Sequence, residues 1–155
     1  MVAENQNINN EFINNQELLK YLIKKIKSQK LQNSIILHGD QGIGKATLII
    51  NVIKNILHIE EKKLITNLIN PNFYYLSPLY DDKKKEYKDN IIIDQIRDLD
   101  KNIKLTNLND LPKFILIDPI DSLNLNASNA LLKILEEPPI NTYFFLISHQ
   151  LNKVL

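Results

Sequence analysis

The sequence predicts a three-layer α/β fold in which a parallel sheet lies between helices, and three observations support it. An apolar run at 35–37 precedes a glycine-rich turn, and an apolar helical pattern follows that turn. Two more continuous apolar runs, 114–117 and 143–147, are typical of strands that are buried on both faces of a parallel sheet. A helix with an apolar face lies between these two runs.

The glycine-rich turn extends from Gly39 to Lys45 and has the pattern G-x-x-x-x-G-K between a strand and a helix, which is typical of a phosphate-binding loop. Glycines let the backbone wrap closely around a polyphosphate, so that successive N–H groups point into one concavity. The following helix adds free N–H groups and the positive end of its dipole, and Lys45 adds a charge. The predicted nucleotide-binding residues are Gly39, Gln41, Gly42, Ile43, Gly44, Lys45, Ala46 and Thr47. The alternative is a glycine-rich turn that binds no ligand.

The residue after the lysine departs from this pattern. A phosphate loop usually has Ser or Thr there, and its hydroxyl binds Mg²⁺, whereas this chain has Ala46. Thr47 follows, but one residue along a helix rotates the side chain by about 100°, so Thr47 is not an obvious replacement. We therefore expect ATP or ADP as the cofactor if a nucleotide binds, with weak or absent Mg²⁺.

Length and composition narrow the class of protein. The 155 residues are enough for one domain with a core, and 44% of them are hydrophobic. The net charge of +1 is too small to attract the protein strongly to nucleic acid or to a membrane surface. The absence of cysteine excludes disulfides and thiolate zinc sites, and no apolar run is long enough to span a bilayer. The start is unlike a signal peptide, so we expect a cytoplasmic protein with a polar arm at 1–15 and one domain at 16–155.

The first helix is predicted at 16–28, where apolar residues recur with helical spacing. The expected apolar face consists of Leu18, Leu19, Leu22, Ile23 and Ile26. On the opposite face, Lys20, Lys24 and Lys27 form a basic stripe. This stripe is either a solvated face or a contact for nucleic-acid phosphates.

The middle of the chain predicts a strand at 73–76 and a solvated loop at 81–86, where the charges are mixed. Asp94 is expected to cap a second helix. The apolar face of that helix consists of Ile96, Leu99 and Ile103. Arg97 lies on this helix and is the only arginine in the chain.

The strand predicted at 111–118 ends in a carboxylate, Asp118. In a parallel sheet this carboxylate emerges at the carboxyl edge beside the phosphate loop, where it can hold Mg²⁺ directly or through water. Pro119 follows, at a position where nucleotide hydrolases of this type usually place a glutamate that activates water. Asp121 is expected to cap the local turn with Ser122.

The last helix is predicted at 127–136, with Asn126 as its cap and a stop at Pro138. Its apolar face is expected to consist of Leu131, Leu132 and Leu135. A final buried strand is predicted at 142–148. The spacing of His38, His58 and His149 matches no metal motif. His38 and His149 either lie near the nucleotide-binding edge or pack at strand ends, and we expect strand-end packing.

A specific resemblance lies in the run 129–139, which reads NALLKILEEPP. Together with IDPID at 117–121 and LISH at 146–149, it closely resembles the bacterial clamp-loader subunits of the AAA+ class, and most of all the delta-prime family of DNA polymerase III. The segments GIGKATL at 42–48 and IDQIR at 93–97 fit the same family. The resemblance covers roughly residues 15–155 and implies the P-loop NTPase fold of AAA+ (RecA-like) proteins.

The resemblance carries over to few functional residues. It implies nucleotide contacts at Gly39, Gly42, Gly44 and Lys45. It implies a Walker-B role for Asp118 and a sensor-1 role for Ser148. Pro119 replaces the family's catalytic glutamate, so no catalytic residue is expected. The cysteine zinc module of many relatives is absent, and the arginine-finger motif would lie beyond Leu155.

The function implied by the resemblance is that of a clamp-loader subunit in DNA replication, which binds nucleotide weakly without hydrolysing it. Its partners would be the gamma/tau and delta subunits of the DNA polymerase III holoenzyme, with indirect contact to the sliding clamp, indirect or weak contact to DNA, and no membrane. One alternative is an active AAA+ ATPase of the gamma/tau kind, which Ala46 and Pro119 argue against. A second is a phosphate-loop small-molecule kinase, which usually needs several arginines. A third is a scaffold with a vestigial loop.

The resemblance also implies a parallel sheet of five strands, of which the sequence places four. The fifth strand and the lid are expected after Leu155, so that the chain is either a fragment or a truncated gene product. The strand at 34–38 is then expected to be an apolar edge, which would make the isolated chain self-associate or borrow a strand.

Overall fold

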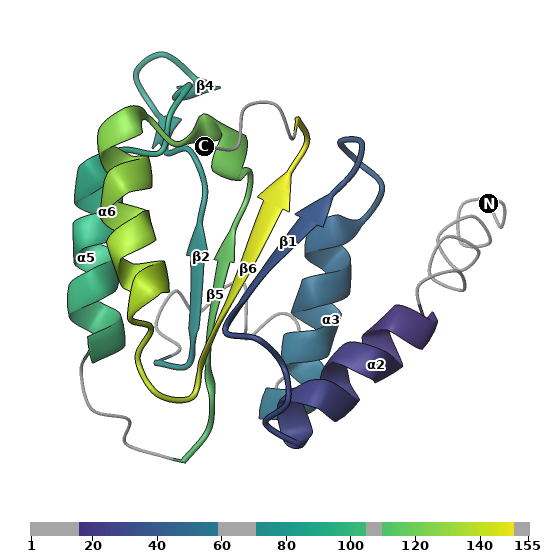
Figure 1. The fold of residues 1–155 in the computed structure, drawn as a ribbon. Coiled ribbons are helices and arrows are strands. Elements are labelled where there is room, and N and C mark those ends of the chain that lie inside the picture. The colour runs from purple at the N-terminus through teal and green to yellow at the C-terminus, as the bar shows by residue number, and fades with distance from the viewer. Residues whose placement is uncertain (1–15, 59–70, 105–109, 151–155) are drawn as a thin grey trace, which may run out of the picture.

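A parallel four-stranded sheet forms the centre of the protein in the computed structural model, which describes residues 16–58, 71–104 and 110–150 (Figure 1). The strand order is β1-β6-β5-β2, and every neighbouring pair is parallel. The bounds are β1 Ser34–His38, β2 Phe73–Leu76, β5 Lys113–Ile117 and β6 Thr142–Ser148. All four predicted strands are therefore confirmed.

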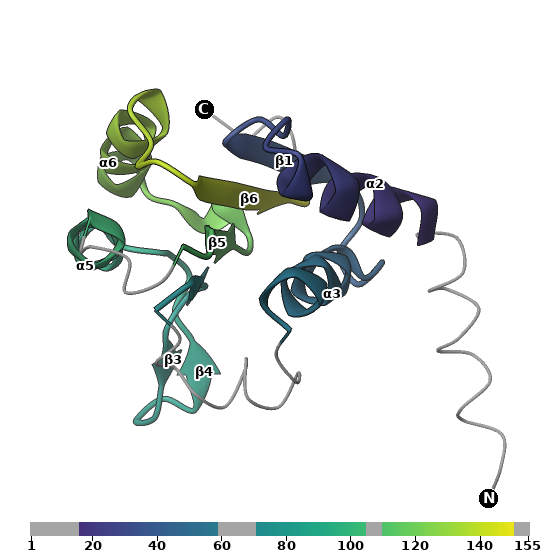
Figure 2. The same cartoon turned by 90° about the horizontal axis from the view of Figure 1, so that it is seen from below.

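Helices cover both faces of this sheet, as Figure 2 shows from below. One face carries α2 (Gln16–Lys27) and α3 (Lys45–Leu57), and the other carries α5 (Ile93–Lys104) and α6 (Leu125–Glu136). The predicted three-layer α/β fold is confirmed.

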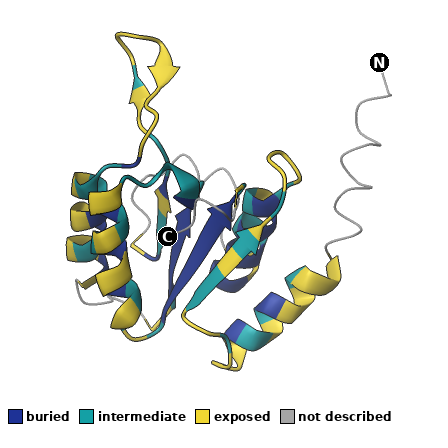
Figure 3. Ribbon diagram, turned by 45° about the horizontal axis from the view of Figure 1, so that its top comes forward, coloured by how far each residue is buried: buried dark blue, intermediate teal, exposed yellow. Residues whose placement is uncertain are grey.

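Two apolar cores follow from the alternation of side chains along β5 and β6. Phe114 and Leu116 pack into the core under α2 and α3, whereas Ile115 and Ile117 pack into the core under α5 and α6. Every residue of β5 and β6 is buried, and the outer helix faces are exposed (Figure 3). The helical pattern after the phosphate loop is confirmed, because all six predicted core residues of α3 are buried: Leu48, Ile49, Val52, Ile53, Ile56 and Leu57.

Two predicted apolar faces need correction. On α2, Leu22 and Ile26 are buried, but Leu18 is 42% exposed because it lies at the edge of the stripe facing α3. On α6, Leu131 is buried, whereas Leu132 is 44% exposed. The α6 stripe runs instead through Ala127, Leu131 and Ile134, which recur at helical spacing, with Leu135 partly buried beside it.

The predicted caps of α5 and α6 were each misplaced. Helix α6 begins at Leu125, and the side chain of Asn124, not Asn126, accepts a 2.9 Å hydrogen bond from the Ala127 backbone N–H. Asp94 lies inside the first turn of α5, and the side chain of Gln95 accepts a 3.1 Å bond from Ile92 N. A side chain at the third position of a helix can reach back and accept a hydrogen bond from the backbone N–H at the start of that helix. The sequence pattern alone does not show whether this residue or the residue before the helix acts as the cap.

Residues 82–86 are exposed as expected, but the segment at 81–86 is not a plain loop. It forms the turn of a small hairpin between β3 (Tyr80–Asp81) and β4 (Glu86–Tyr87). The Asp81 carboxylate accepts bonds from Lys83 N and Lys84 N and thereby holds the turn. The rings of Tyr80 and Tyr87 pack edge to face at 5.1 Å, which supports the pairing across the hairpin.

Strand β1 lies at one end of the sheet among the described residues, which confirms its predicted edge position. Ile36 on this strand is 49% exposed. Self-association through this edge stays a prediction. The predicted polar arm at 1–15 lies outside the described residues, and within the described part of the chain no helix has the length and apolarity to cross a membrane.

Candidate phosphate-binding site

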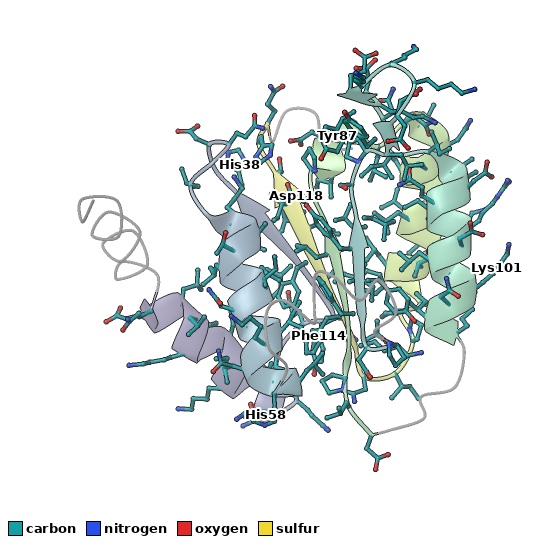
Figure 4. The ribbon with its side chains drawn as sticks, turned by 180° about the vertical axis from the view of Figure 1, so that it is seen from behind. His38, His58, Tyr87, Lys101, Phe114 and Asp118 are labelled. Carbon is teal, nitrogen blue, oxygen red and sulfur yellow. The ribbon has the colours of Figure 1, made fainter. Side chains whose placement is uncertain are left out.

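The carboxyl ends of β1, β5 and β6 meet at one edge of the sheet, and a cleft of about 430 Å³ opens there. Figure 4 shows His38 and Asp118 at this end and Phe114 and His58 toward the opposite end. The lining residues come from the glycine-rich loop, the start of α3 and two strand ends: Gln41, Gly42, Gly44, Lys45, Ala46, Thr47, Asp118, Pro119, Ile147 and His149. Parallel topology thus brings together segments that lie more than a hundred residues apart in the sequence.

The glycine-rich loop adopts backbone conformations that require glycine. Gly42 and Gly44 have φ angles of 87° and 86°, in the left-handed region that glycine adopts without strain. Gly44 is the N-cap residue of α3, and glycine has no side chain that could accept a hydrogen bond. The first backbone N–H groups of α3 therefore receive no side-chain acceptor from the N-cap residue. At Gly39, a Cβ atom would lie 2.8 Å from the Cδ1 atom of Ile43. The loop therefore has the backbone form of an anion-binding turn.

Lys45 is buried, and its ammonium group contacts three acceptors. Its Nζ atom donates to the backbone oxygens of Gly39 and Asp40, both at 2.7 Å. It also lies 3.1 Å from Nδ1 of His149. His149, expected to pack at a strand end, instead lines the cleft, whereas His38 is exposed at the end of β1. The position of His149 directly after β6 was the one signal that placed it near this edge.

Asp118 lies on the other side of His149, whose Nε2 atom is 3.6 Å from Asp118 Oδ1. Burial raises the pKa of the Asp118 carboxyl above its usual value. The nearby His149 ring and the Lys45 ammonium group lower this pKa, and Asp121 raises it. Because burial is the largest of these influences, the Asp118 carboxylate is poorly solvated and would gain from a cation in the cleft.

Asp121 has a different role from the predicted one. It does not cap a turn with Ser122; its carboxylate accepts from the Ser148 hydroxyl at 2.9 Å, from His149 N at 2.6 Å and from Gln150 N at 3.1 Å. Asp121 therefore fixes the end of β6 beside the short helix η1 (Ile120–Ser122). Ser148 is buried in this contact and is not among the cleft-lining residues, and its sensor role stays a prediction.

The cleft provides few oxygen ligands for a metal. Ala46 and Thr47 both line it, but Ala46 has no oxygen on its side chain. Asp118 is the one carboxylate among the lining residues. No group of three or more His, Cys, Asp or Glu side chains within 16–58, 71–104 and 110–150 could hold a metal ion. The donor set thus fits a magnesium ion only in part, with Asp118 as the residue that would hold it.

A glycine-rich loop between β1 and α3, a carboxylate after β5 and a parallel sheet covered by helices have the arrangement of a phosphate-loop α/β domain. The family model described as DNA polymerase III, delta subunit, matches residues 14–155, so the chain belongs to this family. The resemblance that the sequence predicted is confirmed.

Curated relatives and a solved structure agree with this assignment. The chain is 31% identical to DNA polymerase III subunit delta' of Pseudomonas aeruginosa over 134 residues, which cover 79% of this chain and 39% of the relative. It is 26% identical to the Bacillus subtilis subunit delta' over 148 residues, which cover 89% of this chain and 43% of the relative. The chain thus spans about two fifths of the length of these relatives. A gamma subunit-related protein of Thermotoga maritima has the same fold, with a TM-score of 0.68, 20% identity and coverage of 88% of this chain and 41% of that one.

Proposed function

We propose that this chain acts in DNA replication as a delta-prime-like subunit of the DNA polymerase III clamp loader, which places the sliding clamp on primed DNA. The observation that carries the proposal is the family match over 14–155. The partners are the gamma/tau and delta subunits, and contact with DNA is indirect or weak. The proposed work takes place on chromosomal DNA in the cytoplasm.

The proposed role includes weak nucleotide binding without hydrolysis. The loop backbone and Lys45 have the form that accommodates phosphates, which supports binding of ATP or ADP. Pro119 lines the cleft directly after Asp118 and has no group that could accept a proton from water. Ala46 lacks the hydroxyl that would hold Mg²⁺ at the start of α3. Nucleotide therefore serves assembly and not turnover.

Two assays on the purified chain test the nucleotide part of the proposal. We expect no steady-state phosphate release from ATP, and weak binding of a fluorescent ATP analogue that depends little on Mg²⁺. Lys45→Ala should abolish binding, because it removes the charge at the phosphate position. Turnover that Lys45→Ala abolishes would instead identify an active ATPase of the gamma/tau kind.

The metal position is tested by Ala46→Ser, which restores the missing hydroxyl. Binding of the ATP analogue should then become more strongly dependent on Mg²⁺. If Ala46→Ser leaves the Mg²⁺ dependence unchanged while Lys45→Ala abolishes binding, the account of the metal site is wrong.

Assembly is tested separately from nucleotide binding. The chain is mixed with gamma/tau and delta subunits of the same source, and complexes are measured by size-exclusion chromatography with light scattering. We expect the chain to enter a complex with gamma/tau. A gamma/tau–delta complex that forms normally and excludes this chain would contradict the proposed role.

A further inference from the structure

The ammonium group of Lys45 has no donor left for a ligand. A lysine ammonium offers three N–H donors, and three acceptors of this chain lie within hydrogen-bonding distance of Nζ. Two are backbone oxygens of the phosphate loop itself, those of Gly39 and Asp40, at 2.7 Å. The third, at 3.1 Å, is the His149 side chain from the neighbouring strand β6. A phosphate oxygen that binds Lys45 must therefore replace one of the three.

The contact between Lys45 and His149 defines the state of the imidazole ring. Because an ammonium group only donates, Nδ1 of His149 must be the acceptor, and the ring proton lies on Nε2. Nε2 faces Asp118 at 3.6 Å, so the proton points toward a carboxylate. The ring therefore lies between the lysine and the carboxylate of the cleft.

The backbone around His149 is held by hydrogen bonds that do not involve its side chain. His149 N and Gln150 N both donate to the Asp121 carboxylate, and the Ser148 hydroxyl donates to it as well. These bonds fix the end of β6 and make no use of the imidazole ring. Rotation about the side-chain bonds is thus the smallest change that frees a donor of Lys45, whereas release of Gly39 O or Asp40 O would reshape the loop.

We propose that His149 is an internal competitor for the phosphate site, whose imidazole occupies the position on Lys45 that the terminal phosphate of a nucleoside di- or triphosphate would take. The proposal rests on the proposed nucleotide binding. Phosphate capture exchanges one acceptor of Lys45 for another and turns the His149 ring away. The cost of breaking the Lys45–His149 bond lowers the affinity of the loop for phosphate. His149 is in this sense a specificity-determining residue that selects for anions strong enough to displace it.

Two substitutions of His149 distinguish the effect of the Nδ1 acceptor from the effect of the rest of the imidazole ring. His149→Ala removes the competitor, so affinity for the ATP analogue and for inorganic pyrophosphate without Mg²⁺ should rise by about 2- to 10-fold, the worth of one hydrogen bond. His149→Asn places an amide oxygen near the position of Nδ1 and should keep affinity close to that of the unmodified chain. The matched control is His38→Ala, a histidine at the end of the adjacent strand that is exposed and is not among the cleft-lining residues, which should change nothing.

Titration calorimetry and fluorescence without Mg²⁺ provide the affinities, and thermal denaturation checks that each variant is folded. An unchanged or lower affinity in His149→Ala would overturn the competition, and the proposed nucleotide binding would stand because the unmodified chain still binds. Absence of binding in every variant would overturn both, while the assembly assay would still report on the clamp-loader role.

Nuclear magnetic resonance of the unmodified chain tests the same proposal without any substitution. With ¹⁵N-labelled histidine at about pH 8, where a free imidazole is neutral, His149 should show the Nε2–H form with Nδ1 as an acceptor. Added pyrophosphate should move the Nδ1 resonance away from its hydrogen-bonded position and leave that of His38 in place. A His149 resonance that pyrophosphate does not shift, at concentrations that saturate binding, would overturn the proposal.

Discussion

The interior of the sheet and its carboxyl edge are built from the same strands, yet they are stabilised in opposite ways. In the interior, every residue of β5 and β6 is buried, and Phe114 stacks on Tyr143 and Phe145 with ring centroids 5.9 and 6.4 Å apart. At the edge, the same strands end in polar groups around a cleft. The interior depends on close packing and the edge on hydrogen bonds and charge.

The edge itself contains two carboxylates with unequal support. Asp121 accepts three hydrogen bonds from the end of β6. Asp118 is partly buried, and its Oδ1 atom lies 3.6 Å from Nε2 of His149. The comparison shows that Asp121 is a structural anchor for the end of β6, whereas Asp118 has less support from hydrogen bonds, and a buried carboxylate without full support costs stability.

The largest effect is expected in the interior, from Leu131→Ala on α6. Leu131 is 4% exposed, so the substitution should lower the free energy of unfolding by about 2–5 kcal/mol in a denaturant titration. Its matched control is the neighbour Leu132, which is 44% exposed, and Leu132→Ala should cost less than about 1 kcal/mol. Equal losses for the two variants would show that this face of α6 is not packed as described.

A smaller loss is expected at the edge from Asp121→Ala. This change leaves the buried Ser148 hydroxyl and two backbone N–H groups without their acceptor, and it should cost about 2–3 kcal/mol, the worth of hydrogen bonds to a charged group. The control is Asp98→Ala, which breaks an exposed pair with Lys101 and should change stability by no more than about 0.5 kcal/mol. If both variants lost the same amount of stability, Asp121 would be no more important for the fold than the exposed Asp98.

The smallest effect, and one of opposite sign, is expected from Asp118→Asn. Burial raises the pKa of Asp118 above its ordinary value of 3.8, so the protonated carboxyl is the better-tolerated form in the folded chain. The favourable contribution of the protonated Asp118 to stability is fully present at pH values below the pKa that this carboxyl has in the unfolded chain. It is lost as the pH rises through the pKa that the carboxyl has in the folded chain. At neutral pH the charged side chain therefore destabilises the fold, and the neutral Asn should relieve this.

Denaturant titrations of Asp118→Asn and of the unmodified chain at several pH values test this prediction. The variant should be the more stable one at neutral pH, and the difference should shrink as the pH falls toward 3.8 and below. A variant that is less stable at neutral pH would mean that the contact with His149 outweighs the cost of burial, and that Asp118 supports the fold as Asp121 does.

Local patterns in the sequence determined the four strands of the main sheet, the helices beside them and part of the candidate site. Continuous apolar runs predicted β5 and β6, helical spacing predicted α3, and the glycine pattern predicted the loop around Lys45. These signals are local, because backbone sterics and the period of a helix or a strand act within a few residues. Asp118 could be placed at the cleft for the same reason, since it follows a buried strand directly.

Only the tertiary structure decided which polar groups meet at the edge. The bond from Ser148 to Asp121 joins residues 27 positions apart, and the contact between Lys45 and His149 joins residues 104 positions apart. From the sequence we predicted that Asp121 caps a local turn and that His149 packs at a strand end. The sequence shows which neighbouring groups a side chain can reach, but it does not show which distant residues the fold brings beside it. The choice was made by the strand order, which sets β6 between β1 and β5 and so brings His149 to Lys45 and Asp118.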